Sequence, residues 1–236
     1  ILRRQSLMSD TLSHVSLSGV AFGLFLGFSP TISTVIVVII AAVFLEYLRK
    51  VYKDFMEIGT AILMSTGLAL ALVIMKGGGK SSMSLDQYLF GSTLTITDEQ
   101  VLALSVIAAI VLCLTVLFIR PMYILTFDED TAYVDGLPVR LMSILFNIVT
   151  GVAIALMIPA AGSLLVSTIM VLPASIALKL GKTFRSVMLL AVVIGFVGMV
   201  SGLILSYYPD TPVSATITLL FVSFFLLSNL FVKFRK

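Results

Sequence analysis

The uncharged stretch 141-LMSILFNIVTGVAIALMIPAAGSLLVSTIMVLPASIAL-178 decides the fold of this chain. It contains no Asp, Glu, Lys or Arg, and a transmembrane helix needs about 20 consecutive apolar residues. The stretch is therefore long enough for two spans, and 159-PAAG-162 is the expected turn between them. Pro173 falls inside the second span, where it should kink the helix because proline has no backbone donor.

The composition of the whole chain is typical of a polytopic helical membrane protein. Of its 236 residues, 59% are hydrophobic and 11% are charged, and the mean hydropathy is +1.16. Such a chain is too apolar for a soluble domain, and no polar stretch is long enough to form a second domain. Residues 1–236 are therefore interpreted as one all-α transmembrane domain. Cys113 is the only cysteine, which excludes an intrachain disulfide.

Other apolar runs bring the predicted number of transmembrane helices to about eight. The remaining predicted spans are Leu7–Phe28, Thr31–Leu45, Ile58–Met75, Val101–Ile119, Val187–Leu205 and Val213–Val232. Leu85–Ile96 is too short to cross the hydrocarbon core and is expected to be interfacial or re-entrant. Because the chain opens with Ile1 and then Arg3-Arg4, a preceding transmembrane helix is expected to be missing from it.

The positions of the cations predict how the chain is oriented in the membrane. If the spans alternate from a cytoplasmic amino end, all 15 Lys and Arg residues except Lys76 and Lys80 lie on one side. The positive-inside rule makes that side cytoplasmic. The carboxyl terminus is therefore predicted to be cytoplasmic as well.

The strongest candidate site lies in the first predicted span. Asp10 and His14, the latter being the only histidine, are four residues apart and so share one face of a helix. Ionisable side chains inside a membrane are energetically costly and are usually functional. A carboxylate and an imidazole supply an oxygen and a nitrogen ligand for a divalent metal such as zinc. The alternative is that Asp10 caps the helix while His14 lies at the membrane interface without binding metal.

An acidic connection after Val101–Ile119 predicts a short cytoplasmic helix, about Phe127–Asp135. Thr126 and Glu129 have the spacing of a capping box, Gly136 suits the residue after the helix, and Pro138 prevents its continuation. A compact, capped helix is suited to docking in a groove of a soluble partner. The alternative is a solvated surface turn.

The remaining polar motifs are interpreted as structural. Gly79-Lys80-Ser81 imitates the end of a phosphate-binding loop, but the glycine required five residues earlier is Ile74. No nucleotide site is therefore predicted in this chain. Polar residues within the predicted spans are expected to form interhelical hydrogen bonds. They are Ser65, Asn147, Ser163, Ser167, Thr168 and Ser201.

Several blocks of the sequence together resemble the membrane permease subunit of bacterial ABC importers for zinc and manganese. The blocks are 3-RRQSLMSDTLSH-14 with Gly19, 88-YLFG-91, 130-DTAYVDG-136, 162-GSLL-165 and 172-LPA-174. The first block, followed by 20-VAFG-23, is closer to the zinc-type members than to the manganese-type members.

This resemblance implies a transport subunit rather than an enzyme, because ATP hydrolysis belongs to separate cytoplasmic subunits in this family. It also implies a homodimer in the lipid of a bacterial cell membrane, an extracytoplasmic metal-binding lipoprotein, no nucleic-acid partner and no permanently bound cofactor. The cargo would be Zn²⁺, with Mn²⁺ as the alternative. Asp10 and His14 match the metal-contacting pair of the family. The coupling helix of the family matches Asp128, Glu129, Asp130, Tyr133, Asp135 and Gly136.

Two other functions remain open from the residues. A secondary transporter could couple metal movement to protons through Asp10, Glu46 or Glu57. A permease for vitamin B12 or siderophores shares the many-helix plan, but it gives no reason for an aspartate and a histidine at helical spacing.

Overall fold

The computed structural model describes residues 6–52, 56–77, 90–91, 96–207 and 211–235. Throughout these ranges the regular structure is α-helical, which confirms the predicted fold class. The helices are α1 (Ser6–Leu26), α2 (Pro30–Val51), α3 (Met56–Gly77), α5 (Asp98–Phe127), α6 (Glu129–Val134), α7 (Val139–Ala161), α8 (Ser163–Leu180), α9 (Phe184–Tyr207) and α10 (Val213–Arg235). The predicted segment Leu85–Ile96 lies almost entirely outside the described residues.

Among the described helices, 7 are long and apolar enough to cross a membrane: α2, α3, α5, α7, α8, α9 and α10. The other predicted span is α1, which has 21 residues but carries Asp10, His14 and a series of hydroxyl groups. It packs against α2, α3, α7 and α8 and is therefore enclosed by more apolar helices. A helix of this polarity is stable at membrane depth because protein rather than lipid surrounds it.

Glycines bring the neighbouring helices into backbone contact with α1. A Cβ added to Gly19 would lie 2.6 Å from the Cα of Thr34, and one added to Gly23 would lie 2.8 Å from the Cα of Pro30. On the other side, a Cβ at Gly67 of α3 would lie 2.8 Å from the Cα of Val15. Small residues at such contacts permit the close packing that associates helices in membranes.

The buried hydroxyl groups of α1 are satisfied within the protein. Ser13 donates to the carbonyl of Ser9 over 2.9 Å, and Ser18 donates to the carbonyl of Val15 over 2.7 Å. Thr11 donates to the carbonyl of Leu7 over 2.8 Å and also lies 3.4 Å from the Thr60 carbonyl of α3. These bonds to preceding carbonyls remove most of the cost of burying hydroxyl groups in an apolar region.

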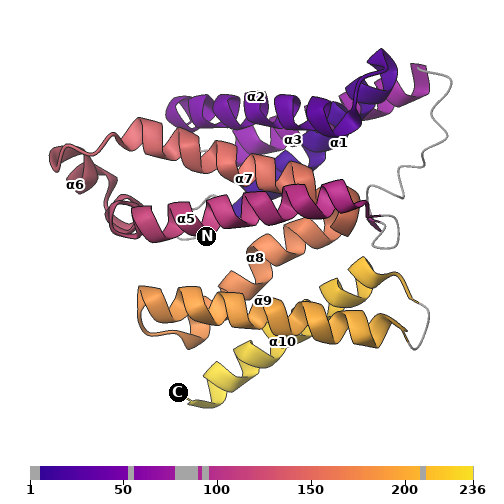
Figure 1. Ribbon diagram of the computed structural model, residues 1–236. Helices are drawn as coiled ribbons and strands as arrows, with labels where there is room; N and C mark the ends of the chain where they lie inside the picture. Colours follow the sequence, from indigo (N-terminus) through magenta and orange to yellow (C-terminus); the bar gives the residue numbers. More distant parts are fainter. Residues whose placement is uncertain (1–5, 53–55, 78–89, 92–95, 208–210, 236) are drawn as a thin grey trace.

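The helices form two groups that meet at α8 (Figure 1). One group has α1, α2, α3 and α7 around the largest apolar core, with α5 packed against α7. In the other group, α8, α9 and α10 pack together around Leu165, Ile217 and Phe221. Because α8 also contacts α1 and α7, it joins the two groups.

The turn predicted at 159-PAAG-162 is confirmed at Gly162 alone, because Pro159, Ala160 and Ala161 are helical residues of α7. α7 ends at Ala161, Gly162 adopts φ 80° and ψ 152°, and α8 begins at Ser163. This left-handed conformation is open to glycine and strained for other residues. Gly91 packs on the turn, since a Cβ there would lie 2.5 Å from the Ala161 carbonyl carbon. Pro173 is buried inside α8, and the kink expected of it stays a prediction.

The short helix α6 is present, but the predicted capping box is wrong. α5 continues to Phe127, so Thr126 is helical and its hydroxyl donates to the Met122 carbonyl. Asp128 is the N-cap instead, with Oδ1 accepting from the backbone N–H groups of Asp130 at 3.1 Å and Thr131 at 3.0 Å. The Thr131 hydroxyl also donates to this carboxylate. These bonds, led by that of the hydroxyl, hold the pKa of Asp128 below its ordinary value.

Gly136 ends α6 as the sequence predicts. Its φ is 76°, its N–H donates to the Tyr133 carbonyl over 3.1 Å, and the N–H of Leu137 donates to the Ala132 carbonyl over 3.1 Å. This pair of bonds is the Schellman motif, which requires a left-handed residue after the helix. α6 is therefore closed at both ends, and a small core of Leu125, Ala132, Val139 and Met142 holds it to α5 and α7.

Gly19→Ala should destabilise the protein, because its methyl group would meet the backbone of α2 at Thr34. We expect a loss of about 1–3 kcal/mol in the free energy of unfolding, as for other overpacked sites. Gly77→Ala is the matched control, since no other helix of the described residues comes within 4 Å of a Cβ at Gly77. Thermal unfolding of both variants in detergent measures the difference, and equal melting temperatures would contradict the proposed backbone contact.

Candidate metal site

Asp10 and His14 are the two side chains of α1 that remain partly open along a buried run. All residues from Met8 to Ala21 except these two are buried. The Asp10 side chain is 39% exposed and that of His14 is 26% exposed. An ion that approaches this part of α1 therefore meets a carboxylate and an imidazole.

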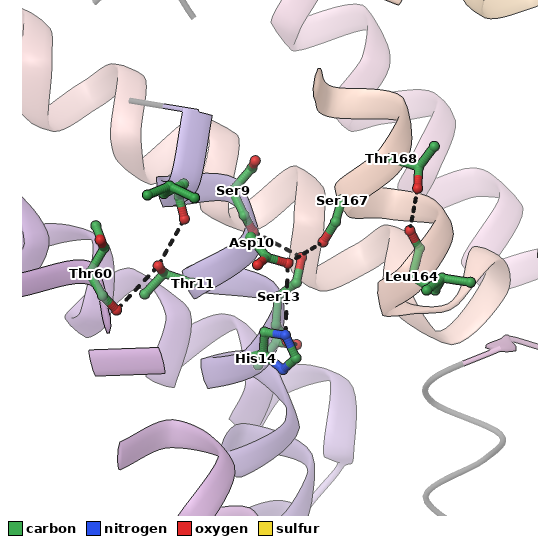
Figure 2. Close-up of polar contacts among 11 residues, drawn as sticks. Ser9, Asp10, Thr11, Ser13, His14, Thr60, Leu164, Ser167 and Thr168 are labelled. Carbon is green, nitrogen blue, oxygen red and sulfur yellow. Dashed lines mark hydrogen bonds and ion pairs between the residues drawn. The ribbon is translucent and has the colours of Figure 1, made fainter. Parts of the chain in front are cut away.

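The two side chains lie close together and are joined to α8 (Figure 2). His14 Nε2 is 3.7 Å from Asp10 Oδ1, the expected arrangement of residues four apart on a helix. The Ser167 hydroxyl of α8 donates to the same Oδ1 over 2.9 Å. Ser167 thus fixes the carboxylate from the opposite group of helices.

The donor set fits a divalent cation, but one protomer supplies few ligands. Zinc in proteins is usually bound by four ligands, with nitrogen, sulfur or carboxylate oxygen as donors. Nowhere in the described part of the chain do three or more His, Cys, Asp or Glu residues form a group that could hold a metal. The pair therefore needs further ligands from water, hydroxyl groups or a second protomer.

The surroundings of His14 favour reversible rather than permanent metal binding. Its Nδ1 is buried and has no hydrogen-bond partner among the described residues. A metal at Nε2 would leave the ring proton on Nδ1, where metal-binding histidines usually donate to a carboxylate or a carbonyl. An imidazole without that partner would be a weaker metal ligand than one in a structural zinc site.

The site lies where the two groups of helices meet. Asp10 and His14 belong to α1, and Ser167 belongs to α8, which packs against α9 and α10. A relative movement of the groups would change the distance between Ser167 and Asp10. Binding sites at such boundaries can open and close without unfolding either side.

Several predicted interhelical hydrogen bonds are present. Ser167 reaches Asp10, and Thr168 lies 3.2 Å from Thr218 of α10, oxygen to oxygen. Ser201, in contrast, donates to the Val197 carbonyl of its own helix, so the prediction is wrong for this residue.

A second interhelical contact whose two partners the sequence did not pair lies between α2 and α7. Asn147 was expected to bond across helices, and its partner is the buried Glu46, at 2.9 Å from Nδ2 to Oε2. Glu46 is also 3.0 Å from Arg49 Nη2. The signal in the sequence was an acidic residue just beyond the apolar run Thr31–Leu45, three positions before an arginine.

The second candidate region, around α6, lies apart from the Asp10–His14 pair. α6 projects at one end of the helices, on the side where the carboxyl terminus lies (Figure 1). Asp128 and Gly136 cap the helix, as described above. Tyr133 is 76% exposed and its apolar neighbour Val134 is 83% exposed. Exposed large apolar side chains on a short helix are typical of an interaction surface.

Apolar helices able to cross a membrane, which surround a helix with a polar site, define an integral membrane protein. The chain belongs to the ABC 3 transport family, whose profile matches residues 1–232. It is 27% identical over 97% of its length to the high-affinity zinc uptake system membrane protein ZnuB of Haemophilus influenzae, and it covers 87% of that protein.

Two further relatives agree with this assignment. The manganese import system permease protein ScaB of Streptococcus parasanguinis is 29% identical over 97% of this chain, with 81% of ScaB covered. The solved structure of PsaBC from Streptococcus pneumoniae in complex with Fab matches with a TM-score of 0.84 and 29% identity, over 97% of this chain and 82% of that one. The chain is therefore a multi-pass membrane permease of an ABC transporter.

Ser167→Ala should weaken metal binding without removing a ligand of the Asp10–His14 pair. Losing one hydrogen bond to a carboxylate corresponds to about 1–2 kcal/mol, or roughly a fivefold to thirtyfold loss of affinity. Equilibrium dialysis of the purified permease with zinc measures this change. Thr168→Val is the matched control, because the neighbouring hydroxyl contacts Leu164 and Thr218 instead. Equal affinities of the two variants would show that Ser167 does not position Asp10.

Proposed function

We propose that this chain is the permease subunit of an ATP-driven importer that carries a divalent metal, with zinc as the preferred cargo and manganese as the alternative. The observation that carries the proposal is the partly open pair Asp10 and His14 in an otherwise buried run of α1. The names of the relatives support it, since one belongs to a zinc uptake system and another to a manganese import system.

The donor types favour zinc over manganese. Imidazole suits zinc, whereas manganese is bound well by sites rich in carboxylate, carbonyl and water oxygens. With one histidine nitrogen and one carboxylate, the pair offers zinc a stronger interaction per ligand. The missing hydrogen-bond partner of His14 Nδ1 keeps that interaction weak enough for release.

A homodimer offers one way to complete the metal shell. A twofold axis repeats each residue, so two Asp10 and two His14 side chains would meet if the open part of α1 faced the axis. The other way is one ion in each protomer, with water and serine oxygens as the remaining ligands. Both arrangements use the same two residues of this chain.

Two kinds of partner protein are proposed, one on each side of the membrane. Cytoplasmic ATP-binding subunits would dock on α6, where Tyr133 and Val134 are exposed and Asp128, Asp130 and Asp135 supply negative charge. In this proposal the carboxyl terminus is cytoplasmic as well. A metal-binding lipoprotein would deliver the ion from the opposite side of a bacterial cell membrane.

Asp10→Ala and His14→Ala should each abolish metal uptake while the protein still folds and inserts, because each removes one of the two ligands. Asp10→Asn should be as stable as the parent or more so, since an amide oxygen can still accept from Ser167 and no intramembrane charge remains. The measurement is radioactive zinc uptake in cells that lack their own permease, with membrane levels compared by blot. Near-normal uptake by either alanine variant at equal expression would exclude the pair as the metal site.

Gly136→Leu combined with Asp135→Lys should uncouple the permease from its ATP-binding subunits. The left-handed φ of Gly136 disfavours leucine, and lysine reverses a charge at the end of α6. We expect an inserted protein whose complex has lost metal-stimulated ATP hydrolysis. Unchanged stimulation in the purified complex would show that the docking site is elsewhere.

A further inference from the structure

Glu46 forms a buried ionic contact that the metal site does not use. Glu46 is 2% exposed, and its Oε1 is 3.0 Å from Nη2 and 3.3 Å from Nε of Arg49, one turn further along α2. Its other oxygen, Oε2, accepts from Nδ2 of Asn147 on α7 over 2.9 Å. Both oxygens of the acidic side chain are therefore engaged. We call Glu46, Arg49 and Asn147 the α2–α7 clamp.

Burying the clamp costs free energy, and separating its partners would cost more. Asn147 is 1% exposed, and its Oδ1 has no hydrogen-bond partner among the described residues. An apolar pair at these positions would avoid both the buried charge and the unpaired oxygen. If α2 and α7 moved apart, the amide and one carboxylate oxygen would lose their partners in a low-dielectric region. The clamp therefore strongly disfavours separation of the two helices.

α7 is directly connected to the proposed docking helix. α6 ends at Val134, and α7 begins at Val139 after a four-residue connection that contains the Schellman turn. Leu125, Ala132, Val139 and Met142 pack α6 onto the ends of α5 and α7. Asn147 lies on α7 eight residues after its start, so a displacement of α6 reaches Asn147 through one continuous helix.

α2 in turn is packed tightly on the helix that carries the metal ligands. Gly19 and Gly23 of α1 bring its backbone against Thr34 and Pro30. Closer to the site, a Cβ at Gly151 of α7 would lie 2.8 Å from Val38 and 3.6 Å from Leu12, which is two residues from both Asp10 and His14. The helices α1, α2 and α7 therefore all contact one another close to Asp10 and His14.

We propose that the α2–α7 clamp makes these helices move as one body, so that ATP-driven displacement of α6 reaches Asp10 and His14 on α1. Glu46 and Asn147 are positioning residues in this proposal, because neither touches the ion. The inference rests on the proposed function and adds to it the link between the docking helix and the metal site. Such a link is established by measured coupling rather than by proximity.

The test uses the complete transporter, with the permease, its ATP-binding subunits and its metal-binding protein, reconstituted in liposomes. Zinc uptake and ATP hydrolysis are measured together for the parent, for Asn147→Leu and for Glu46→Gln. Thr168→Val is the matched control, because it removes a polar contact between α8 and α10. The decisive quantity is the number of zinc ions imported per ATP hydrolysed, which a loss of folded protein alone does not change.

Asn147→Leu should lower zinc imported per ATP by about fivefold or more, the smallest effect typical of a coupling contact. Glu46→Gln should stay near the parent ratio, since its amide oxygen still accepts from Asn147. Thr168→Val should also keep that ratio. A parent-like ratio in Asn147→Leu would overturn the inference. A parent complex that hydrolyses ATP but imports no divalent metal would instead overturn the proposed function.

A second variant keeps the test decisive if Asn147→Leu does not fold. Glu46→Cys and Asn147→Cys are combined in a Cys113→Ala background, and the two thiols are joined by a short reducible cross-linker. Without the cross-link, the double-cysteine protein should import few zinc ions per ATP hydrolysed. With the cross-link in place, it should recover the parent number of zinc ions per ATP. If bridging stops transport, α2 and α7 must separate during the cycle, and the clamp does not act as a rigid link.

Discussion

The enclosure of α1 by other helices is the constraint on which the rest of the structure depends. Lipid offers no hydrogen bonds, so a helix carrying six hydroxyl residues, an aspartate and a histidine within 6–26 must be surrounded by protein. Gly19 and Gly23 bring α2 into backbone contact, and Gly67 brings α3. Serine and threonine hydroxyls bond to carbonyls of the same helix, so burial leaves few polar groups without a partner. Asp10 and His14, the proposed metal ligands, can therefore lie on a helix that other helices surround.

The residues of the candidate site come from two helices that belong to different helix groups. Asp10 and His14 lie on α1, and Ser167 lies on α8. α1 is held mainly by α2 and α3, and it also contacts α7 and α8; α8 carries Ser167 and packs against α9 and α10 as well. Because the contact between Ser167 and Asp10 crosses the boundary, it is sensitive to any movement of one helix group relative to the other. A transporter needs such a boundary, since the affinity for its cargo has to fall during each cycle.

Sequence reasoning was most successful where hydropathy or backbone geometry decides the structure. Apolar runs located the spans, and Gly162 and Gly136 marked turns that need a left-handed residue. It failed at the start of α6, because the register of α5 beyond Pro121 decides whether Thr126 or Asp128 is the cap. It could pair Asp10 with His14 by helical spacing. It could not pair Asp10 with Ser167, or Glu46 with Asn147, because those contacts depend on how distant helices cross.

The exposure of Tyr133 and Val134 has a consequence for how the cell must produce this protein. When the proposed ATP-binding partner is absent, these side chains form an exposed apolar surface on α6. A permease made in excess of its covering partner would present that surface to other proteins and to proteases. Synthesis of the subunits in equal amounts, for instance from one transcript, would then supply a working transporter. It would also prevent the accumulation of permease molecules whose α6 surface is uncovered.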